Sequence, residues 1–190
     1  SMLVAELADP KENDFVIDVC AAPGGKSVHL AEKLHGTGMV EARDLTEYKV
    51  ELIQENIERH QLSNMCAVQK DATVLDEASV GKADVVIADL PCSGLGVMRK
   101  KTDIKYKMTL ETEKELVVLQ QKMLDTVCLY VKAGGTLLYS TCTMDKMENE
   151  DNVAWFLEHH LEFELVKMQQ IFPQKTYGDG FFLAKLQKKA

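Results

Sequence analysis

A chain of 190 residues, 46% hydrophobic and 27% charged, is long enough to form one globular domain with a complete core, and its composition excludes a disordered or fibrous protein. A formal net charge of −8 is unfavourable for binding nucleic acid over the whole surface, because phosphate contacts depend on Lys and Arg. The apolar runs are far shorter than the roughly 18 residues of a membrane span, and the N-terminus lacks a basic segment followed by an apolar one. We therefore expect a cytoplasmic protein with no membrane partner.

The first half of the chain alternates short apolar runs with segments of helical periodicity. Residues 15–20 suit a buried strand, and a glycine turn separates them from a predicted helix near residues 26–34. Apolar residues at 50, 53 and 57 predict a second helix that ends near His60. Further strands are predicted over residues 38–43, 66–69 and 83–89, the last apolar enough to be buried on both faces of a parallel sheet.

A loop at residues 90–108 opens the second half, and a long helix follows it. Apolar residues at 116, 119, 123, 127 and 131 predict this helix, and Gly134 and Gly135 are predicted to end it. A strand over 136–140 comes next, followed by a helix from about Glu148 with acids in its first turn, where the helix dipole favours them. Two late runs, 163–166 and 181–186, are predicted to form a closing pair of strands.

The five cysteines and five histidines indicate neither a disulfide framework nor a metal site. The cysteines form no CxxC pair and leave one residue unmatched, and the histidines have no partner at metal-ligand spacing. We interpret the cysteines as reduced thiols and expect no bound metal.

Repeated alternation of strands and helices predicts a doubly wound α/β sheet, in which ligands bind beyond the carboxyl ends of the strands. Chemically capable residues gather at or just past those predicted strand ends. They are Asp18, the loop from Cys20 to Lys26, Asp44, Asp71, Asp89, Cys92 and Cys142. Chance explains one or two such positions far more easily than all of them, so we expect one site at this edge of the sheet.

The loop CAAPGGK matches no common phosphate-binding pattern in full. It has Cys20 where a P-loop has its first glycine, and it does not match GxGxxG, so a tight turn without a ligand stays an open alternative. Asp44 lies nineteen residues past Gly25, where a carboxylate either accepts hydrogen bonds from both hydroxyls of a ribose or caps a helix that opens at Thr46. Asp71 either contacts the adenine region of the same ligand or starts a turn.

Cys92 and Cys142 follow two strand-like runs, in ADVVIADLPCSG and GGTLLYSTCT. If these runs are neighbouring parallel strands, the two thiols share one cleft, because paired strands lie about 5 Å apart. A thiolate is a strong nucleophile where its pKa is lowered, so the pair indicates thiolate chemistry. The residues alone do not rank the two thiols.

Three segments resemble motifs I, IV and VI of the RNA cytosine-5 methyltransferases that use S-adenosylmethionine. They are DVCAAPGGKSVHLAE, ADLPCSGLGVMRKKTDIKY and YSTCTMDKMENE. The DIKY segment, the long helix before GGTLLYSTC and the terminal GDGFFLAKL resemble the bacterial RsmB (Sun, Fmu) type, which acts on 16S ribosomal RNA. The resemblance implies a class I, Rossmann-like methyltransferase fold with a mostly parallel sheet of about seven strands, helices on both faces and an antiparallel C-terminal strand.

The resemblance also implies roles for individual residues. Cys142 matches the nucleophile that adds to C6 of cytosine, and Cys92 matches the second cysteine, which helps to release the product. Asp89 and Lys26 would assist at the ring. The cofactor would be held by Cys20, Ala21, Ala22, Pro23, Gly24, Gly25, Lys26, Asp44, Asp71 and Asp89.

Binding of RNA is expected to involve the segment MRKKTDIKYK, which carries five cations and one anion. Its cations would meet phosphates, and Gly94 and Gly96 before them would approach a base flipped out of the RNA stack. The cations are Arg99, Lys100, Lys101, Lys105 and Lys107.

Family members usually carry an N-terminal RNA-binding region, so we expect one catalytic domain over residues 1–190 that is a fragment with weak RNA affinity of its own. A tRNA cytosine-5 methyltransferase, a non-catalytic RNA-binding or assembly factor, and a small-molecule or protein methyltransferase are the alternatives.

Overall fold

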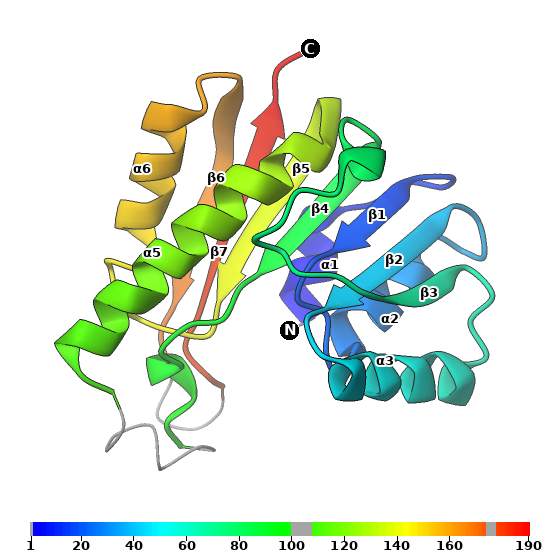
Figure 1. The fold of residues 1–190 in the computed structure, drawn as a ribbon, viewed down its shortest axis with the longest axis horizontal. Helices are drawn as coiled ribbons and strands as arrows, with labels where there is room; N and C mark the ends of the chain where they lie inside the picture. Colours follow the sequence, from blue (N-terminus) through cyan, green and yellow to red (C-terminus); the bar gives the residue numbers. More distant parts are fainter. Residues whose placement is uncertain (1, 100–107, 174–177) are drawn as a thin grey trace.

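A seven-stranded sheet in the order β3-β2-β1-β4-β5-β7-β6 forms the centre of the computed structural model, which describes residues 2–99, 108–173 and 178–190 (Figure 1). The five strands from β3 to β5 are parallel, whereas β7 pairs antiparallel with both β5 and β6. The strands are β1 (Phe15–Asp18), β2 (Met39–Asp44), β3 (Met65–Gln69), β4 (Ala83–Asp89), β5 (Val131–Thr141), β6 (Phe163–Ile171) and β7 (Phe181–Lys188).

Helices cover both faces of the sheet, because successive residues of the central strands point to opposite sides and are apolar on both. Helices α5 and α6 cover one face, and α1, α2 and α3 cover the other (Figure 1). Val86 belongs to the core cluster on the first face, whereas its neighbours Val85 and Ile87 belong to the cluster on the second. The predicted doubly wound fold with an antiparallel C-terminal strand is confirmed. The helices are α1 (Met2–Ala8), α2 (Gly25–Lys33), α3 (Glu47–His60), α5 (Leu110–Val127) and α6 (Glu150–His159).

The prediction that Gly134 and Gly135 end the long helix is wrong. Helix α5 ends at Val127, a short 3₁₀ turn spans Cys128–Tyr130, and β5 begins at Val131 and contains both glycines. Gly134 adopts a left-handed φ of 73°, and the pairing of β5 with β4 is irregular here. The glycines therefore bend a strand.

Two further elements differ from expectation. Helix α1 was not predicted, although Val4 and Ala5 are fully buried and the helix packs on α2 and β5. Strand β6 continues five residues beyond the predicted 163–166, to Ile171, because β7 offers it a partner along this length. No helix among the described residues is long and apolar enough to cross a membrane.

Candidate active site

The glycine loop is fixed to the end of the neighbouring strand β2. The amide of Ala21 donates to the carbonyl of Arg43 (2.8 Å), and the amide of Ala22 donates to the Asp44 carboxylate (3.0 Å). Gly24 then adopts a left-handed φ of 109° as α2 begins, a conformation that L side chains rarely adopt. The loop thus reverses the chain tightly beside the ends of β1 and β2.

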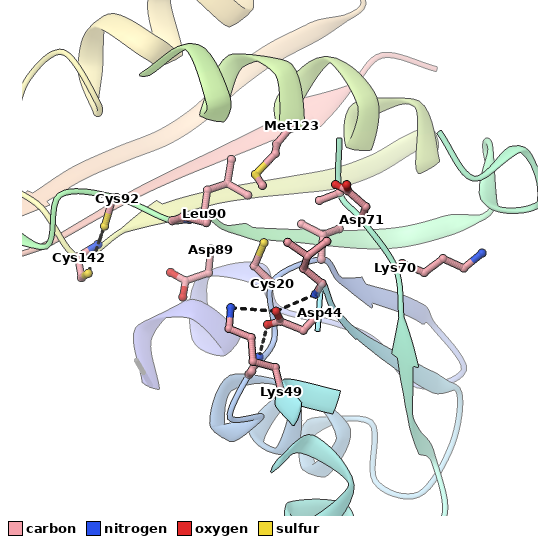
Figure 2. Close-up of a pocket in the computed structure, with 15 residues that line it drawn as sticks. Cys20, Asp44, Lys49, Lys70, Asp71, Asp89, Leu90, Cys92, Met123 and Cys142 are labelled. Carbon is pink, nitrogen blue, oxygen red and sulfur yellow. Dashed lines mark hydrogen bonds and ion pairs between the residues drawn. The ribbon is translucent and has the colours of Figure 1, made fainter. Parts of the chain in front are cut away.

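A cavity of about 410 Å³ lies beyond the carboxyl ends of the parallel strands (Figure 2). Five of the predicted cofactor residues line it, namely Cys20, Ala22, Asp44, Asp71 and Asp89. Both candidate thiols, Cys92 and Cys142, also line it. The predicted residues Ala21, Pro23, Gly24, Gly25 and Lys26 do not belong to its wall.

Asp44 is 3% exposed, and its hydrogen bonds rule out the role of a helix cap. One carboxylate oxygen accepts from the amide of Ala22, and the other accepts from the amide of Leu45 (2.8 Å) and pairs with the Lys49 ammonium (3.0 Å). None of these donors is the first free amide of α3, whose N-cap is Thr46. Asp44 instead presents a fixed carboxylate to the cavity (Figure 2).

Asp71 both starts a turn and lines the cavity, so the two alternatives for this residue are compatible. Its carboxylate accepts hydrogen bonds from the amide and the hydroxyl of Thr73, each 2.8 Å long. These bonds lower the pKa of Asp71, which therefore stays ionised.

Sequence patterns did not identify Leu90, Met123 and Lys49, which also line the cavity and come from separate elements.

The two thiols at the ends of β4 and β5 are in contact. These strands pair with Asp89 opposite Ser140, which brings Cys92 Sγ within 3.2 Å of Cys142 Sγ. The amide of Cys142 also donates to Cys92 Sγ (3.3 Å). The hydrogen bond with Cys142, and then burial, raise the pKa of Cys92. Cys92 therefore keeps its proton at neutral pH.

Lys26 and Asp89 form a half-buried ion pair next to the thiols. Lys26 Nζ lies 2.5 Å from Asp89 Oδ2, and the hydroxyl of Ser140 donates to Asp89 Oδ1 (2.6 Å). Burial lowers the pKa of Lys26, but the charge and hydrogen bond of Asp89 outweigh this effect and leave the pKa raised. The ammonium therefore remains charged at neutral pH.

A second cavity of about 350 Å³ adjoins the first. Lys26 and Phe181 line it, with the Lys26 ammonium 5.8 Å from the centre of the Phe181 ring. Cys142 lines both cavities. Cys142 thus lies between two cavities, each large enough for a small ligand.

Of the predicted RNA-binding cations, the structure describes only Arg99, which is exposed; Lys100, Lys101, Lys105 and Lys107 lie outside the described residues. Gly96 lies close to the backbone of two other segments. Its amide donates to the carbonyl of Cys142 (2.9 Å), and its carbonyl accepts from Gly180 (2.8 Å). Gly94 has a left-handed φ of 72°.

The described residues contain no cluster of three potential metal ligands.

Asp18 is fully buried below the loop, and one of its oxygens, Oδ1, has no hydrogen-bond partner among the described residues. Burial raises its pKa from 3.8 to about 6, although Ser27 donates to its other oxygen (2.6 Å). The folded protein thus binds this proton more tightly than the unfolded chain does. The resulting stabilisation is complete below about pH 3.8 and is lost as the pH rises through about 6.

Replacement of Asp18 by Asn removes this titration. The difference in unfolding free energy, variant minus wild type, is expected to rise by about 3 kcal/mol between pH 3 and pH 7, since a tenfold change in proton affinity is worth about 1.4 kcal/mol. Urea unfolding at several pH values measures it. The control Asp71→Asn should show a change of opposite sign that is confined to about pH 3.8 and below, because the pKa of Asp71 is lowered from 3.8. A difference independent of pH for Asp18→Asn would show that this carboxyl has an ordinary pKa.

The sheet order, the antiparallel β7 and the cavity over the parallel strand ends define a Rossmann-like fold of the class I methyltransferases. The family model described as 16S rRNA methyltransferase RsmB/F matches residues 5–187, and the chain belongs to this family. The resemblance drawn from the three motifs is thereby confirmed.

Individual relatives match over nearly the whole chain. The probable ribosomal RNA small subunit methyltransferase B of Bacillus subtilis is 39% identical, with 100% of this chain and 46% of the relative covered. The tRNA (cytosine(72)-C(5))-methyltransferase of Pyrococcus horikoshii is 34% identical, with 99% of this chain and 50% of the relative covered. The crystal structure of NSun6 from Pyrococcus horikoshii with SFG has a TM-score of 0.90 at 33% identity, with 100% of this chain and 51% of the NSun6 chain covered. The chain spans about half the length of these relatives.

Proposed function

We propose that this chain methylates C5 of cytosine in ribosomal RNA, with S-adenosylmethionine as the methyl donor and a covalent bond between Cys142 and C6 of the base. The observation that carries the proposal is the position of Cys142 in the walls of two adjoining cavities. A methyl donor in the first and a pyrimidine in the second would meet beside this thiol.

The residues of the first cavity fit S-adenosylmethionine. Its volume of about 410 Å³ suits a nucleoside-sized ligand. The buried Asp44 carboxylate offers a charged acceptor for the ribose hydroxyls, while Leu90 and Met123 provide apolar surface for a flat base. S-adenosylmethionine supplies an electrophilic methyl group, and SFG, an analogue of it, is present in the NSun6 structure.

The second cavity fits a cytosine that has been flipped out of the RNA. Phe181 offers an aromatic face for stacking, and the charged Lys26 ammonium offers a donor near Cys142. Asp89 holds this ammonium in place and is itself fixed by Ser140. These contacts orient the ring and stabilise the negative charge that develops on it.

Cys142 attacks C6 as a thiolate, and the new S–C6 bond places the electron pair of the C5=C6 bond on C5. That electron pair would then form the bond to the methyl group as the S–CH3 bond of the donor breaks and S-adenosylhomocysteine leaves. The proton on C5 must next leave. Its electron pair re-forms the C5=C6 bond, and the S–C6 bond breaks to release Cys142 as a thiolate. These steps balance without metal or oxidant.

Cys92 is the base best placed to accept the C5 proton, because its sulfur lies 3.2 Å from that of Cys142. The first cause of its raised pKa is the hydrogen bond with Cys142. Bonding of Cys142 to carbon removes the charge from that sulfur. The Cys92 thiol then loses its own proton to solvent more readily, and the thiolate that forms accepts the C5 proton, which supports a role late in the reaction.

Trapping with RNA that contains 5-fluorocytosine tests the proposal. Fluorine replaces the C5 hydrogen that a base would remove as a proton, so Cys142 cannot be eliminated and the covalent adduct persists. The wild type with S-adenosylmethionine is expected to form a covalent complex on a denaturing gel, and Cys142→Ala is expected to form none. Cys66→Ala is the matched control, since Cys66 lies in β3 outside both cavities. Absence of a complex with the wild type contradicts the proposed function.

We also propose that the chain acts as a single catalytic domain, in the cytoplasm, with most RNA affinity supplied from outside it. A net charge of −8 supports weak phosphate binding. Filter binding should show feeble retention of a 16S rRNA transcript at physiological salt, and tight retention would contradict this proposal.

The similarity to a tRNA methyltransferase makes tRNA the second candidate substrate, so methylation of the two RNAs is compared in parallel.

A further inference from the structure

Glu148 is a charged residue that the proposed mechanism does not use. Sequence patterns place it with the acids that open a helix, but α6 begins at Glu150 and the exposed fraction of Glu148 is 0%. In the described part of the chain no cation pairs with it. A buried carboxylate without a counter-ion is costly unless N–H donors satisfy it.

The donors come from the loop that carries Cys92 and from α5. The amide of Ser93 donates to both carboxylate oxygens of Glu148 (3.0 and 3.3 Å), and the side-chain amide of Gln120 donates to one of them (2.8 Å). The same Gln120 amide also donates to the carbonyl of Pro91 (2.9 Å). The backbone on each side of Cys92 is therefore fixed by a hydrogen bond.

Gln120 and Glu148 are held in turn by the polar groups around them. The Gln120 oxygen accepts from Asn152 (2.7 Å), and the Glu148 carbonyl accepts from the hydroxyl of Tyr139 (2.5 Å). Gln120 and Asn152 are both fully buried. Buried polar networks of this kind define one geometry, since each lost bond leaves an unsatisfied group.

We infer that Glu148 and Gln120 are positioning residues that hold the Cys92 sulfur against Cys142 for the release of the methylated product. The inference rests on the proposed function and deepens it. Cys92 acts after methyl transfer, so loss of its position should not slow the formation of the adduct. It should slow the elimination of Cys142, and the enzyme should remain bonded to ordinary RNA.

Two substitutions test this role. Glu148→Gln leaves one acceptor oxygen for the two donors and presents an amide to them, and Gln120→Leu removes the bond to Pro91. The control is Gln121→Leu, because Gln121 is the next residue of α5 and donates to Asn152 (3.0 Å), but in the described part of the chain it has no hydrogen bond to residues 91–93. Each protein is incubated with S-adenosylmethionine and an unmodified 16S rRNA transcript, and covalent complexes are quantified on denaturing gels.

We expect both variants to turn over more slowly by a factor on the order of 10², which is typical of a misplaced catalytic group, and to accumulate covalent complex that the wild type and Gln121→Leu do not. Trapping with 5-fluorocytosine RNA and the affinity for S-adenosylmethionine should remain at wild-type levels. Normal trapping without accumulation on ordinary RNA overturns this inference alone. Joint loss of trapping and cofactor binding in the variants indicates a merely structural role and also overturns it. Failure of the wild type to trap overturns the proposed function as well.

Discussion

Asp44→Asn is expected to weaken the binding of S-adenosylmethionine about 100-fold, or roughly 3 kcal/mol, because hydrogen bonds to a charged acceptor contribute about 1.5–3 kcal/mol each. The amide keeps the shape of the side chain but has one acceptor oxygen. That oxygen serves either Leu45 or Ala22, both of which Asp44 now satisfies. Isothermal titration calorimetry measures the affinity, and thermal unfolding shows whether the fold is intact.

Lys49→Met separates the role of the carboxylate from that of its ion pair. The Lys49 side chain is 49% exposed, so solvent screens its interaction with Asp44 and the pair contributes little. The affinity is expected to change less than about threefold in this variant, which corresponds to under 1 kcal/mol. Equal losses in both variants would mean that the charge balance at the cavity rim, and not the acceptor at residue 44, determines binding.

The strand ends and the paired thiols were predictable because their signals are local. An apolar run followed by a small-residue turn marks where each strand stops, and parallel strands bring their carboxyl ends to one edge. Cys92 and Cys142 meet for this reason, although fifty residues separate them. Which thiol attacks was not a local property, and only the resemblance of the TC and PC segments to family motifs ranked them.

The errors lie where one local pattern fits two long-range arrangements. Gly134 and Gly135 follow apolar residues at helical spacing, which is the pattern of a helix end. Their actual place follows from pairing with β4, where the oxygen of Asp84 would lie 3.0 Å from a Cβ at residue 135. Glu148 likewise resembles an acid at a helix start. Its burial depends on Ser93, which is 55 residues away in the sequence.

Gly96→Ala is expected to lower methyl transfer by a factor on the order of 10², because it displaces the segment that carries the attacking thiol. A Cβ at residue 96 would collide with the carbonyl oxygens of Gly180 and Cys142. Both are backbone atoms, so no side-chain rotation relieves the collision. Overpacking of this kind also lowers the unfolding free energy by roughly 1–3 kcal/mol. Methylation of a 16S rRNA transcript with radiolabelled S-adenosylmethionine measures the first effect, and urea unfolding the second.

Gly36→Ala distinguishes loss of position from loss of stability. Gly36 lies outside both cavities with a φ of 77° and nothing within 4 Å of its Cβ position, so Ala there introduces backbone strain without collision. It should cost about 1 kcal/mol in stability and leave methylation unchanged. If both variants lose stability equally and only Gly96→Ala loses activity, the contact among residues 96, 142 and 180 sets the position of the thiol. If Gly96→Ala stays fully active, the segment tolerates displacement and Cys142 does not depend on that contact for its reactivity.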